Sequence, residues 1–339
     1  PASPRQRQPQ RYCHPSHSRD EPNVNQTTAP AGAPLQTPSD LPELMGKRYR
    51  IERLLGVGGM GAVYRARDLV REQFGDPEPW VALKTLNDTF SRHPDANALL
   101  YSEFALTSRL HHRHIVRPHS FHVDAHSQRA FLTLELLAGP TLDQIMAAQP
   151  QGLPWNDLQP LALALLDALQ HAHQRGVLHG DIKPTNVMLC DSDVRLFDFG
   201  LGQGNEGLLS RLPRLSRRRL AAWTPRYAAL ELLDGGDLSP ATDLYALACV
   251  LYELASGHHP FSRLTARQAM RMDQYSSLQK PANLPAHCWP ALRRALAFEP
   301  AQRTSSVSEL RGVFGQPLRR WWPWPRWAAG CLPLRRTSQ

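Results

Sequence analysis

Residues 179–186 read His-Gly-Asp-Ile-Lys-Pro-Thr-Asn, a short stretch that carries an acid, a lysine and an amide behind a histidine. It places the carboxylate of Asp181, the ammonium of Lys183 and the carboxamide of Asn186 on one short segment. A carboxylate can accept a proton, and carboxylate and amide oxygens bind hard cations. The question is which reaction needs all three groups on one loop, and whether Gly180 disturbs it.

The composition is that of a soluble protein with a large core. The chain has 339 residues, of which 42% are hydrophobic and 20% are charged, enough for one large domain or two lobes. Its five cysteines form no C-x-x-C pair, so we expect neither a disulfide framework nor a zinc site, and a reducing cytoplasm fits best. No run approaches the roughly 18 to 20 apolar residues of a transmembrane span, and the start lacks the apolar core of a secretory signal.

The positive charge is concentrated in a few places. The formal net charge is +9, and arginines gather at both ends and between residues 211 and 219. No nucleic-acid-binding motif accompanies them, so we expect no nucleic-acid partner. The 211–219 strip is either a solvated loop, or a docking strip for acidic substrates or an internal pseudosubstrate.

Both ends of the chain differ in composition from its centre. Residues 1–44 are rich in Pro, Ser, Thr and Gln and predict a disordered leader. Residues 315–339 are rich in Trp, Pro and Arg. We expect this tail to be disordered, with peripheral contact with a membrane surface as the alternative.

Between these ends, the hydrophobic pattern changes from short alternation to helical spacing. Alternation over 49–68, 80–86, 114–123 and 130–137 predicts strands, with one helix over 95–111. Helical patterns follow at 158–176, 241–257, 263–276, 289–297 and 306–314, the first two ending on glycine. This predicts an α+β protein with a small antiparallel sheet lobe over 45–137 and a larger helical lobe over 138–314, joined near the turn at 138–140.

Two features of the sheet lobe point to phosphate binding. Gly56, Gly58 and Gly61 followed by Val63 match G-x-G-x-x-G-x-V, although glycine-rich turns also serve plain hairpins. Lys84 then closes an apolar strand, and Glu103 lies among apolar residues of the next helix. An unpaired carboxylate there would be costly, so we expect a Lys84–Glu103 ion pair that presents the ammonium to nucleotide phosphates.

The order of these motifs resembles a protein kinase, and the glycine loop resembles the bacterial serine/threonine branch. The glycine loop, V-A-L-K, the helix glutamate, H-x-D-x-x-x-x-N and the D-F-G of Asp198 follow one another in the family's order. The resemblance covers about residues 48–314. It implies a two-lobed kinase fold and Mg²⁺-dependent transfer of the γ-phosphoryl group of ATP to protein serine or threonine hydroxyls, with Mn²⁺ as an alternative ion.

The resemblance also implies roles for individual residues. Asp181 would accept or orient the substrate proton, Lys183 would offset charge, and Asn186 with Asp198 would hold the metal ion. Lys84 and Glu103 would form the phosphate-binding pair, and Thr224, with the K-P-T-N form of the loop, resembles enzymes that act on serine and threonine. The implied nucleotide-binding set is Leu55, Gly56, Val57, Gly58, Gly59, Gly61, Val63, Ala82, Lys84, Glu135, Leu137, Asn186, Met188 and Asp198, with Leu134 guarding the back of the pocket.

Outside the nucleotide site, the resemblance implies that Asp243 braces the catalytic loop and that Glu231 pairs with Arg303. Gly180 stands where many kinases have an arginine that binds a phosphorylated activation segment. We therefore expect activity without such phosphorylation. Leu230, Trp223 and Thr107 also differ from the family pattern: the first two are expected to reshape the substrate-binding floor, and Thr107 to loosen the active arrangement.

Two other classes of protein share this pattern. A pseudokinase would bind nucleotide and act as a scaffold without transferring phosphate. A kinase-like phosphotransferase would act on small molecules. The presence of Lys84, Asp181, Lys183, Asn186 and Asp198 together argues against the scaffold, and the Thr224–Glu231 stretch with Arg303 argues for a protein substrate.

Overall fold

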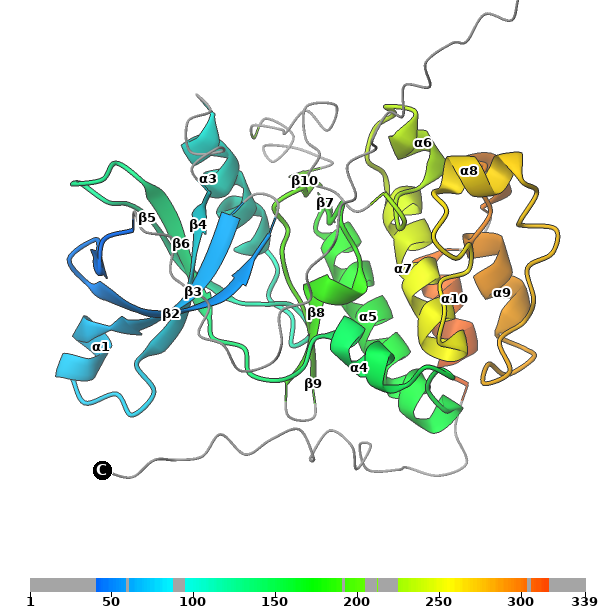
Figure 1. Cartoon of the computed structure of the whole chain (residues 1–339), viewed down its shortest axis with the longest axis horizontal. Coiled ribbons are helices and arrows are strands. Elements are labelled where there is room, and N and C mark those ends of the chain that lie inside the picture. The colour runs from blue at the N-terminus through cyan, green and yellow to red at the C-terminus, as the bar shows by residue number, and fades with distance from the viewer. Residues whose placement is uncertain are drawn as a thin grey trace, which may run out of the picture. The chain divides into compact units, whose positions relative to one another are not determined.

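Alternating apolar and polar residues between Leu44 and Glu135 form one antiparallel sheet. The computed structural model describes residues 41–58, 61–87, 95–190, 193–204, 212, 225–303 and 306–316. All of these belong to one compact unit. The sheet has the strand order β1-β2-β3-β4-β6-β5 (Figure 1). Its strands are β1 (Leu44–Met45), β2 (Tyr49–Val57), β3 (Gly61–Asp68), β4 (Trp80–Leu86), β5 (Pro118–Val123) and β6 (Ala130–Glu135).

The two faces of this sheet bury different clusters, because side chains alternate along a strand. In β6, Phe131 packs with Tyr49, Tyr64 and Leu83 on one face. Its neighbours Ala130 and Leu132 pack against Leu100 of helix α3 (Ala96–Thr107) on the other face. A short helix, α1 (Leu69–Gln73), follows β3 and is capped by Asp68, whose side chain accepts hydrogen bonds from the Val70 and Arg71 amides. The sheet thus holds α3 beside β4.

The second lobe is helical and contains the largest core. Thirteen of the seventeen residues of α7 (Pro240–Ser256) are buried, and α7 packs against α5 (Trp155–Gln174). Ser239 caps α7, and Gly257 ends it with a left-handed φ of +81°. The other helices are α4 (Leu142–Ala148), α6 (Leu230–Leu233), α8 (Ala266–Arg271), α9 (Trp289–Ala295) and α10 (Val307–Phe314).

Short strands lie between the two lobes (Figure 1). The hairpin of β8 (Val187–Cys190) and β9 (Asp193–Leu196) leads to Asp198, and β7 (Val177–Leu178) pairs with β10 (Gln203–Gly204). Two 3-10 turns complete the described elements, Pro184–Asn186 within the loop that opened the sequence and Pro300–Gln302 before α10.

Most predicted elements are present, with one clear correction. The helix predicted over 263–276 is α8, which spans only Ala266–Arg271. Thr265 caps its start through a hydrogen bond from Gln268 N, and Asp273, with a left-handed φ of +48°, follows its end. The helices α1, α4 and α6 and the strands β1 and β7 to β10 were not predicted from the sequence.

Several predictions concern residues outside the described part of the chain. These are the leader up to residue 40, the tail from residue 317, Gly59, Trp223, Thr224 and all of the basic strip except Leu212. In the part that is described, no helix combines the length and the apolar character needed to cross a membrane.

Candidate active site

The roof of the site is the strand pair β2–β3, which meets at the glycine-rich turn. Gly58 N donates to Gly61 O across this turn at 2.8 Å. A Cβ on Gly61 would lie 2.1 Å from the carbonyl oxygen of Thr85 in β4, so only glycine allows this approach of the two backbones. The close contact therefore fixes the turn against β4, the strand that carries Lys84.

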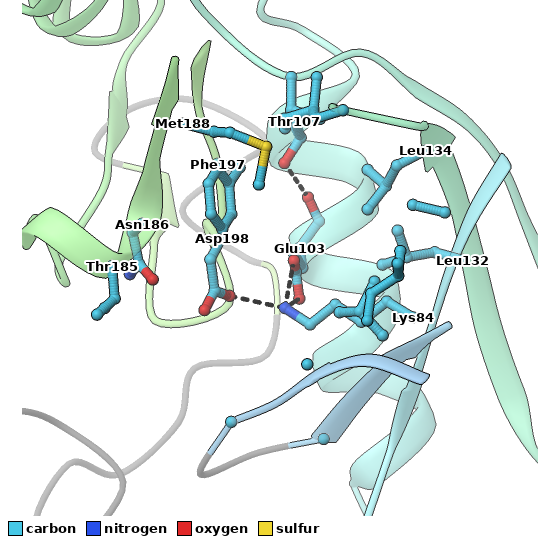
Figure 2. Close-up of a pocket in the computed structure, with 18 of the residues that line it drawn as sticks. Lys84, Glu103, Thr107, Leu132, Leu134, Thr185, Asn186, Met188, Phe197 and Asp198 are labelled. Carbon is cyan, nitrogen blue, oxygen red and sulfur yellow. Dashed lines mark hydrogen bonds and ion pairs between the residues drawn. The ribbon is translucent and has the colours of Figure 1, made fainter. Parts of the chain in front are cut away.

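Three elements bring charged side chains together beneath this roof. Lys84 Nζ, from β4, lies 2.7 and 2.8 Å from the two carboxylate oxygens of Glu103 in α3. The same nitrogen lies 2.7 Å from Asp198 Oδ1, after β9 (Figure 2). The Lys84–Glu103 ion pair expected from the sequence is thus present, and Asp198 joins it.

Burial and opposite charge set the ionisation of this cluster. Burial disfavours the charged form of Lys84, but the carboxylates of Asp198 and Glu103 outweigh it and raise the pKa of the ammonium. Burial also acts against the charge of Asp198, yet Lys84 lowers the pKa of that carboxyl to about 2. Burial raises the pKa of Glu103, while Lys84 opposes the rise. Lys84 and Asp198 therefore remain charged at neutral pH.

The loop of residues 179–186 is held from below by helix α7. Asp243 accepts hydrogen bonds from His179 N and Gly180 N, each at 2.8 Å, and lies 3.0 Å from His173 Nε2. Gly180 has a left-handed φ of +79°, which glycine adopts without strain. Asp243 therefore contacts the loop as the sequence predicted.

His179 is fully buried and fixes the loop by both ring nitrogens. Its Nδ1 accepts from Asp181 N at 3.2 Å, and its Nε2 lies 3.1 Å from the carbonyl oxygen of Phe197, to which it can donate. Burial lowers the pKa of His179, which agrees with a neutral ring protonated on Nε2. The histidine thus joins the catalytic loop to the strand end before Asp198.

The ammonium of Lys183 and the carboxamide of Asn186 converge on the carboxylate of Asp181. Lys183 Nζ donates to Asp181 Oδ2 at 2.6 Å, and Asn186 Nδ2 donates to the same oxygen at 3.2 Å and to Asp181 O at 2.8 Å. Burial raises the pKa of Asp181, while Lys183 opposes the rise. Asp181 is therefore a partly buried carboxylate whose basicity exceeds that of an ordinary aspartate.

A cavity of about 460 Å³ joins the roof, the charged cluster and the loop. This lies within the roughly 300–1,000 Å³ of small-molecule sites. Its apolar end is lined by Leu55, Val63, Ala82 and Met188, with β6 and the segment after it at the edge. Sixteen of the predicted catalytic and nucleotide-binding residues line it: Leu55, Gly56, Val57, Gly58, Gly61, Val63, Ala82, Lys84, Glu103, Glu135, Leu137, Asp181, Lys183, Asn186, Met188 and Asp198. The other two, Gly59 and Thr224, lie outside the described residues.

The cavity also has lining residues that the sequence analysis did not assign to the site. Leu132 and Phe104 come from β6 and α3, and Thr185 lies in the opening stretch itself. Thr185 is the one with a local signal, because it stands between Lys183 and Asn186. The remaining unassigned residues are Thr107, Val116, Pro118, Thr141, Phe197 and Leu201, which reach the cavity through tertiary packing.

Four other residues singled out in the sequence are also described by the structure: Thr107, Leu230, Glu231 and Arg303. Thr107 Oγ1 donates to Glu103 O at 2.8 Å, and the Lys84–Glu103 pair is present despite this small side chain. Arg303 donates to both carboxylate oxygens of Glu231, at 2.7 and 3.2 Å, as expected. Leu230 is buried in α6.

Comparison with known proteins identifies the family. The sequence matches the protein kinase domain over residues 49–314. This chain belongs to the protein kinase family. The match confirms the predicted protein kinase domain, the two lobes of the structure confirm the predicted fold, and the curated relatives support the bacterial serine/threonine branch.

Curated relatives and solved structures place the kinase among bacterial enzymes. It is 30% identical to the serine/threonine-protein kinase PkaA of Streptomyces coelicolor, over 79% of this chain and 50% of that protein. It is 31% identical to the serine/threonine-protein kinase pkn3 of Myxococcus xanthus, over 82% of this chain and 52% of that one. The crystal structure of the Mycobacterium tuberculosis PknI kinase domain superposes with a TM-score of 0.57 at 28% identity, covering 79% of this chain and 95% of that one. The kinase spans about half the length of these curated relatives.

The donor set of the site fits a divalent cation that prefers oxygen ligands. Both hydrogen bonds of the Asn186 carboxamide to Asp181 are made by its nitrogen, which leaves the amide oxygen as an available ligand. Lys84 bonds one carboxylate oxygen of Asp198, so the other can bind a metal ion. Carboxylate and amide oxygens suit Mg²⁺, whereas zinc favours His and Cys.

Proposed function

We propose that this kinase transfers the γ-phosphoryl group of ATP to serine and threonine hydroxyls of proteins, with Mg²⁺ as the metal ion. The observation that carries the proposal is the convergence of Lys84, Asp181 and Asp198 on one cavity beneath the glycine-rich turn. Phosphoryl transfer needs little covalent help from the enzyme, so positioning and electrostatic stabilisation account for most of its catalysis. A cavity with cations and carboxylates at one end and an apolar slot at the other is suited to that task.

Asp181 is the proposed base. The hydroxyl oxygen of the substrate bonds to the γ-phosphorus while the bond from this phosphorus to the β–γ bridging oxygen breaks, so that ADP leaves. The hydroxyl proton passes to Asp181. Its raised pKa favours this role, because a base works best when its pKa approaches the working pH.

The cations of the site oppose charge on the phosphates. Lys84, held by Glu103, would bind phosphate oxygens of the nucleotide, and Lys183 would face the transferring group. Asn186 and Asp198 would hold Mg²⁺, which when bound neutralises charge on the phosphate oxygens. Mn²⁺ would fit the same oxygen ligands.

The apolar end of the cavity would take the adenine. Leu55, Val63 and Ala82 would lie on one side of the ring and Met188 on the other, with backbone groups of Glu135 and Leu137 at its edge. The serine/threonine preference is supported by the names of the bacterial relatives. The role of Thr224 in this preference stays a prediction.

We place the reaction in the cytoplasm, where ATP is supplied. The buried free thiols of Cys249 and Cys288 are compatible with a reducing compartment.

The test is transfer of label from [γ-³²P]ATP with Mg²⁺ to a generic basic protein, followed by phosphoamino acid analysis. We expect labelled phosphoserine and phosphothreonine with the wild type, and none with Asp181→Ala or Lys84→Ala. Nucleotide binding without labelled protein would indicate a pseudokinase scaffold. Label on small molecules alone would indicate the other phosphotransferase class.

A further inference from the structure

Arg195 lies beside the floor of the nucleotide cavity, on strand β9. It is paired directly with Met188 of β8 in the antiparallel register. Directly opposed residues of antiparallel strands carry their side chains on the same face. Because Met188 lines the cavity, the side chain of Arg195 emerges next to the apolar slot. No catalytic motif includes this residue.

The guanidinium of Arg195 touches three segments of the chain. Its Nη1 donates to the carbonyl oxygen of Arg113, in the loop between α3 and β5, and lies 3.4 Å from Asp193 Oδ2. Its Nε lies 3.7 Å from Glu135 Oε1, at the end of β6. The Arg195 side chain is 21% exposed, so these contacts are only partly shielded from water.

The segments that Arg195 joins are themselves bonded to one another. Glu135 and Arg117 exchange hydrogen bonds: Arg117 N donates to Glu135 Oε1 at 2.8 Å, and Glu135 N donates to Arg117 O at 2.9 Å. Leu196 N donates to His114 O at 2.9 Å, one residue beyond Arg195. The α3–β5 loop, the end of β6 and β9 thus form one bonded unit, with Arg195 at its centre.

We propose that Arg195 is a positioning residue that fixes Glu135, and with it the adenine-binding edge of the cavity, against β9. The inference rests on the proposed nucleotide site. Arg195 would not touch the nucleotide. It would restrict the backbone at Glu135, so that the groups meeting the adenine are already in place before binding. Its loss would therefore weaken nucleotide binding and leave the transfer step, which depends on Asp181 and Asp198, largely unchanged.

The size of the effect follows from the exposure of the contacts. The ion pairs of Arg195 are partly exposed and contribute little, and the bond to the Arg113 carbonyl adds a modest contribution. We therefore expect a loss of about threefold to tenfold in nucleotide affinity. A loss of this size is well within the range of a binding measurement.

The experiment compares ATP affinity and steady-state kinetics of the full chain in wild type, Arg195→Ala, Arg195→Lys, Glu135→Gln and the double variant Arg195→Ala/Glu135→Gln. Arg195→Ala should raise the Kd and the KM for ATP by about threefold to tenfold with kcat within about twofold. Arg195→Lys should recover part of the loss. The double variant should bind ATP no more weakly than the single variant with the lower ATP affinity, because both substitutions break the same Arg195–Glu135 contact.

Arg311→Ala is the matched control. Arg311 makes an ion pair with Asp167 and is half exposed, away from the cavity lining. It should leave ATP affinity unchanged.

Unchanged ATP affinity in Arg195→Ala, or a lower kcat at an unchanged KM, would overturn the inference. If Arg195→Ala does not fold, Glu135→Gln tests the same contact, and wild-type affinity in that variant would overturn it as well. A wild-type protein that binds no nucleotide would overturn the proposed function itself. This outcome is seen with the wild type alone, so it cannot be confused with an effect of a substitution.

Discussion

Two ion pairs of this kinase, Lys84–Glu103 and Arg303–Glu231, each contain a buried cation, and they have similar geometry and different surroundings. Each cation lies 2.7 Å from its carboxylate. Arg303 also donates to the carbonyl oxygens of Ala241, Ala297 and Phe298. Lys84 has a second carboxylate, Asp198, and lines the cavity.

In the proposed mechanism the Lys84 pair binds phosphate, whereas the Arg303 pair joins segments of the helical lobe. The partners of Arg303 belong to the protein backbone and Glu231, and they join α6, α7 and the Pro300–Gln302 turn in the helical lobe. The partners of Lys84 come from two segments that meet at the cavity, where a phosphate could share the ammonium. Burial alone therefore does not reveal the role of an ion pair, whereas the other hydrogen-bond partners of its cation do.

Replacing Lys84 should lower activity far more than replacing Arg303. We expect Lys84→Met to lower kcat/KM by about two to three orders of magnitude, because the phosphates lose their buried cation. Stability should fall as well, because the Glu103 side chain, which is only 6% exposed, loses its cation. Label transfer normalised to folded protein, together with thermal unfolding, measures both. Activity within tenfold of the wild type would remove Lys84 from the proposed site.

Replacing Arg303 should instead lower stability and leave activity per folded molecule largely unchanged. Its side chain is fully buried, so Arg303→Met leaves Glu231 and three carbonyl groups without their donor and should cost about 3 kcal/mol of unfolding free energy. Activity per folded molecule should stay within about twofold. Chemical denaturation measures the first quantity, with Arg294→Ala as the control. Arg294 makes an exposed ion pair with Glu309, which should be worth at most about 1 kcal/mol. Equal losses in the two variants would contradict the account.

The pH dependence of activity should reveal Asp181 rather than Asp198. Because the pKa of Asp198 is about 2, this group stays ionised under mildly acidic conditions. Burial raises the pKa of Asp181, so its base form is lost as the pH falls through that raised value. We expect log kcat/KM to fall on the acid side with a slope near one and a midpoint above the ordinary aspartate value of about 3.9. A midpoint at or below that value, in a pH range where the protein stays folded, would rule out the raised pKa.

The backbone at Gly180 should have a smaller effect. Gly180→Ala places a Cβ on a residue with φ of +79°, which costs about 1 kcal/mol, and shifts the amide that Asp243 holds. Gly75→Ala is the matched control, because Gly75 has φ of +77° and open space around it, far from the loop. Both variants should lose similar stability, but only Gly180→Ala should lose about threefold to tenfold in kcat. Equal kcat values in the two would show that Asp243 does not position Asp181 through this residue.

The sequence predicted the parts of the site that lie in short motifs. Lys84, Asp181 and Asp198 were found because each stands in a string with a fixed order along the chain. The Lys84–Glu103 pair followed from the cost of burying a lone carboxylate.

The missed parts have no local pattern. Val116 and Leu201 reach the cavity only through packing. The proposed role of Arg195 depends on contacts with Glu135 and Arg113, which are far from it in the sequence. The strands β7 to β10 have two to four residues each, too few for a visible alternation. Helix α8 was predicted too long because Asp273, rather than a glycine, adopts the left-handed conformation after its end.

The most direct test of the central claim separates binding from transfer at Asp181. Asp181→Asn keeps the size of the side chain and removes the negative charge and basicity of the carboxylate. The account predicts that its affinity for ATP with Mg²⁺ stays within about threefold of the wild type, while single-turnover transfer to a protein serine falls by about two orders of magnitude or more. Transfer at the wild-type rate in this variant would contradict the account.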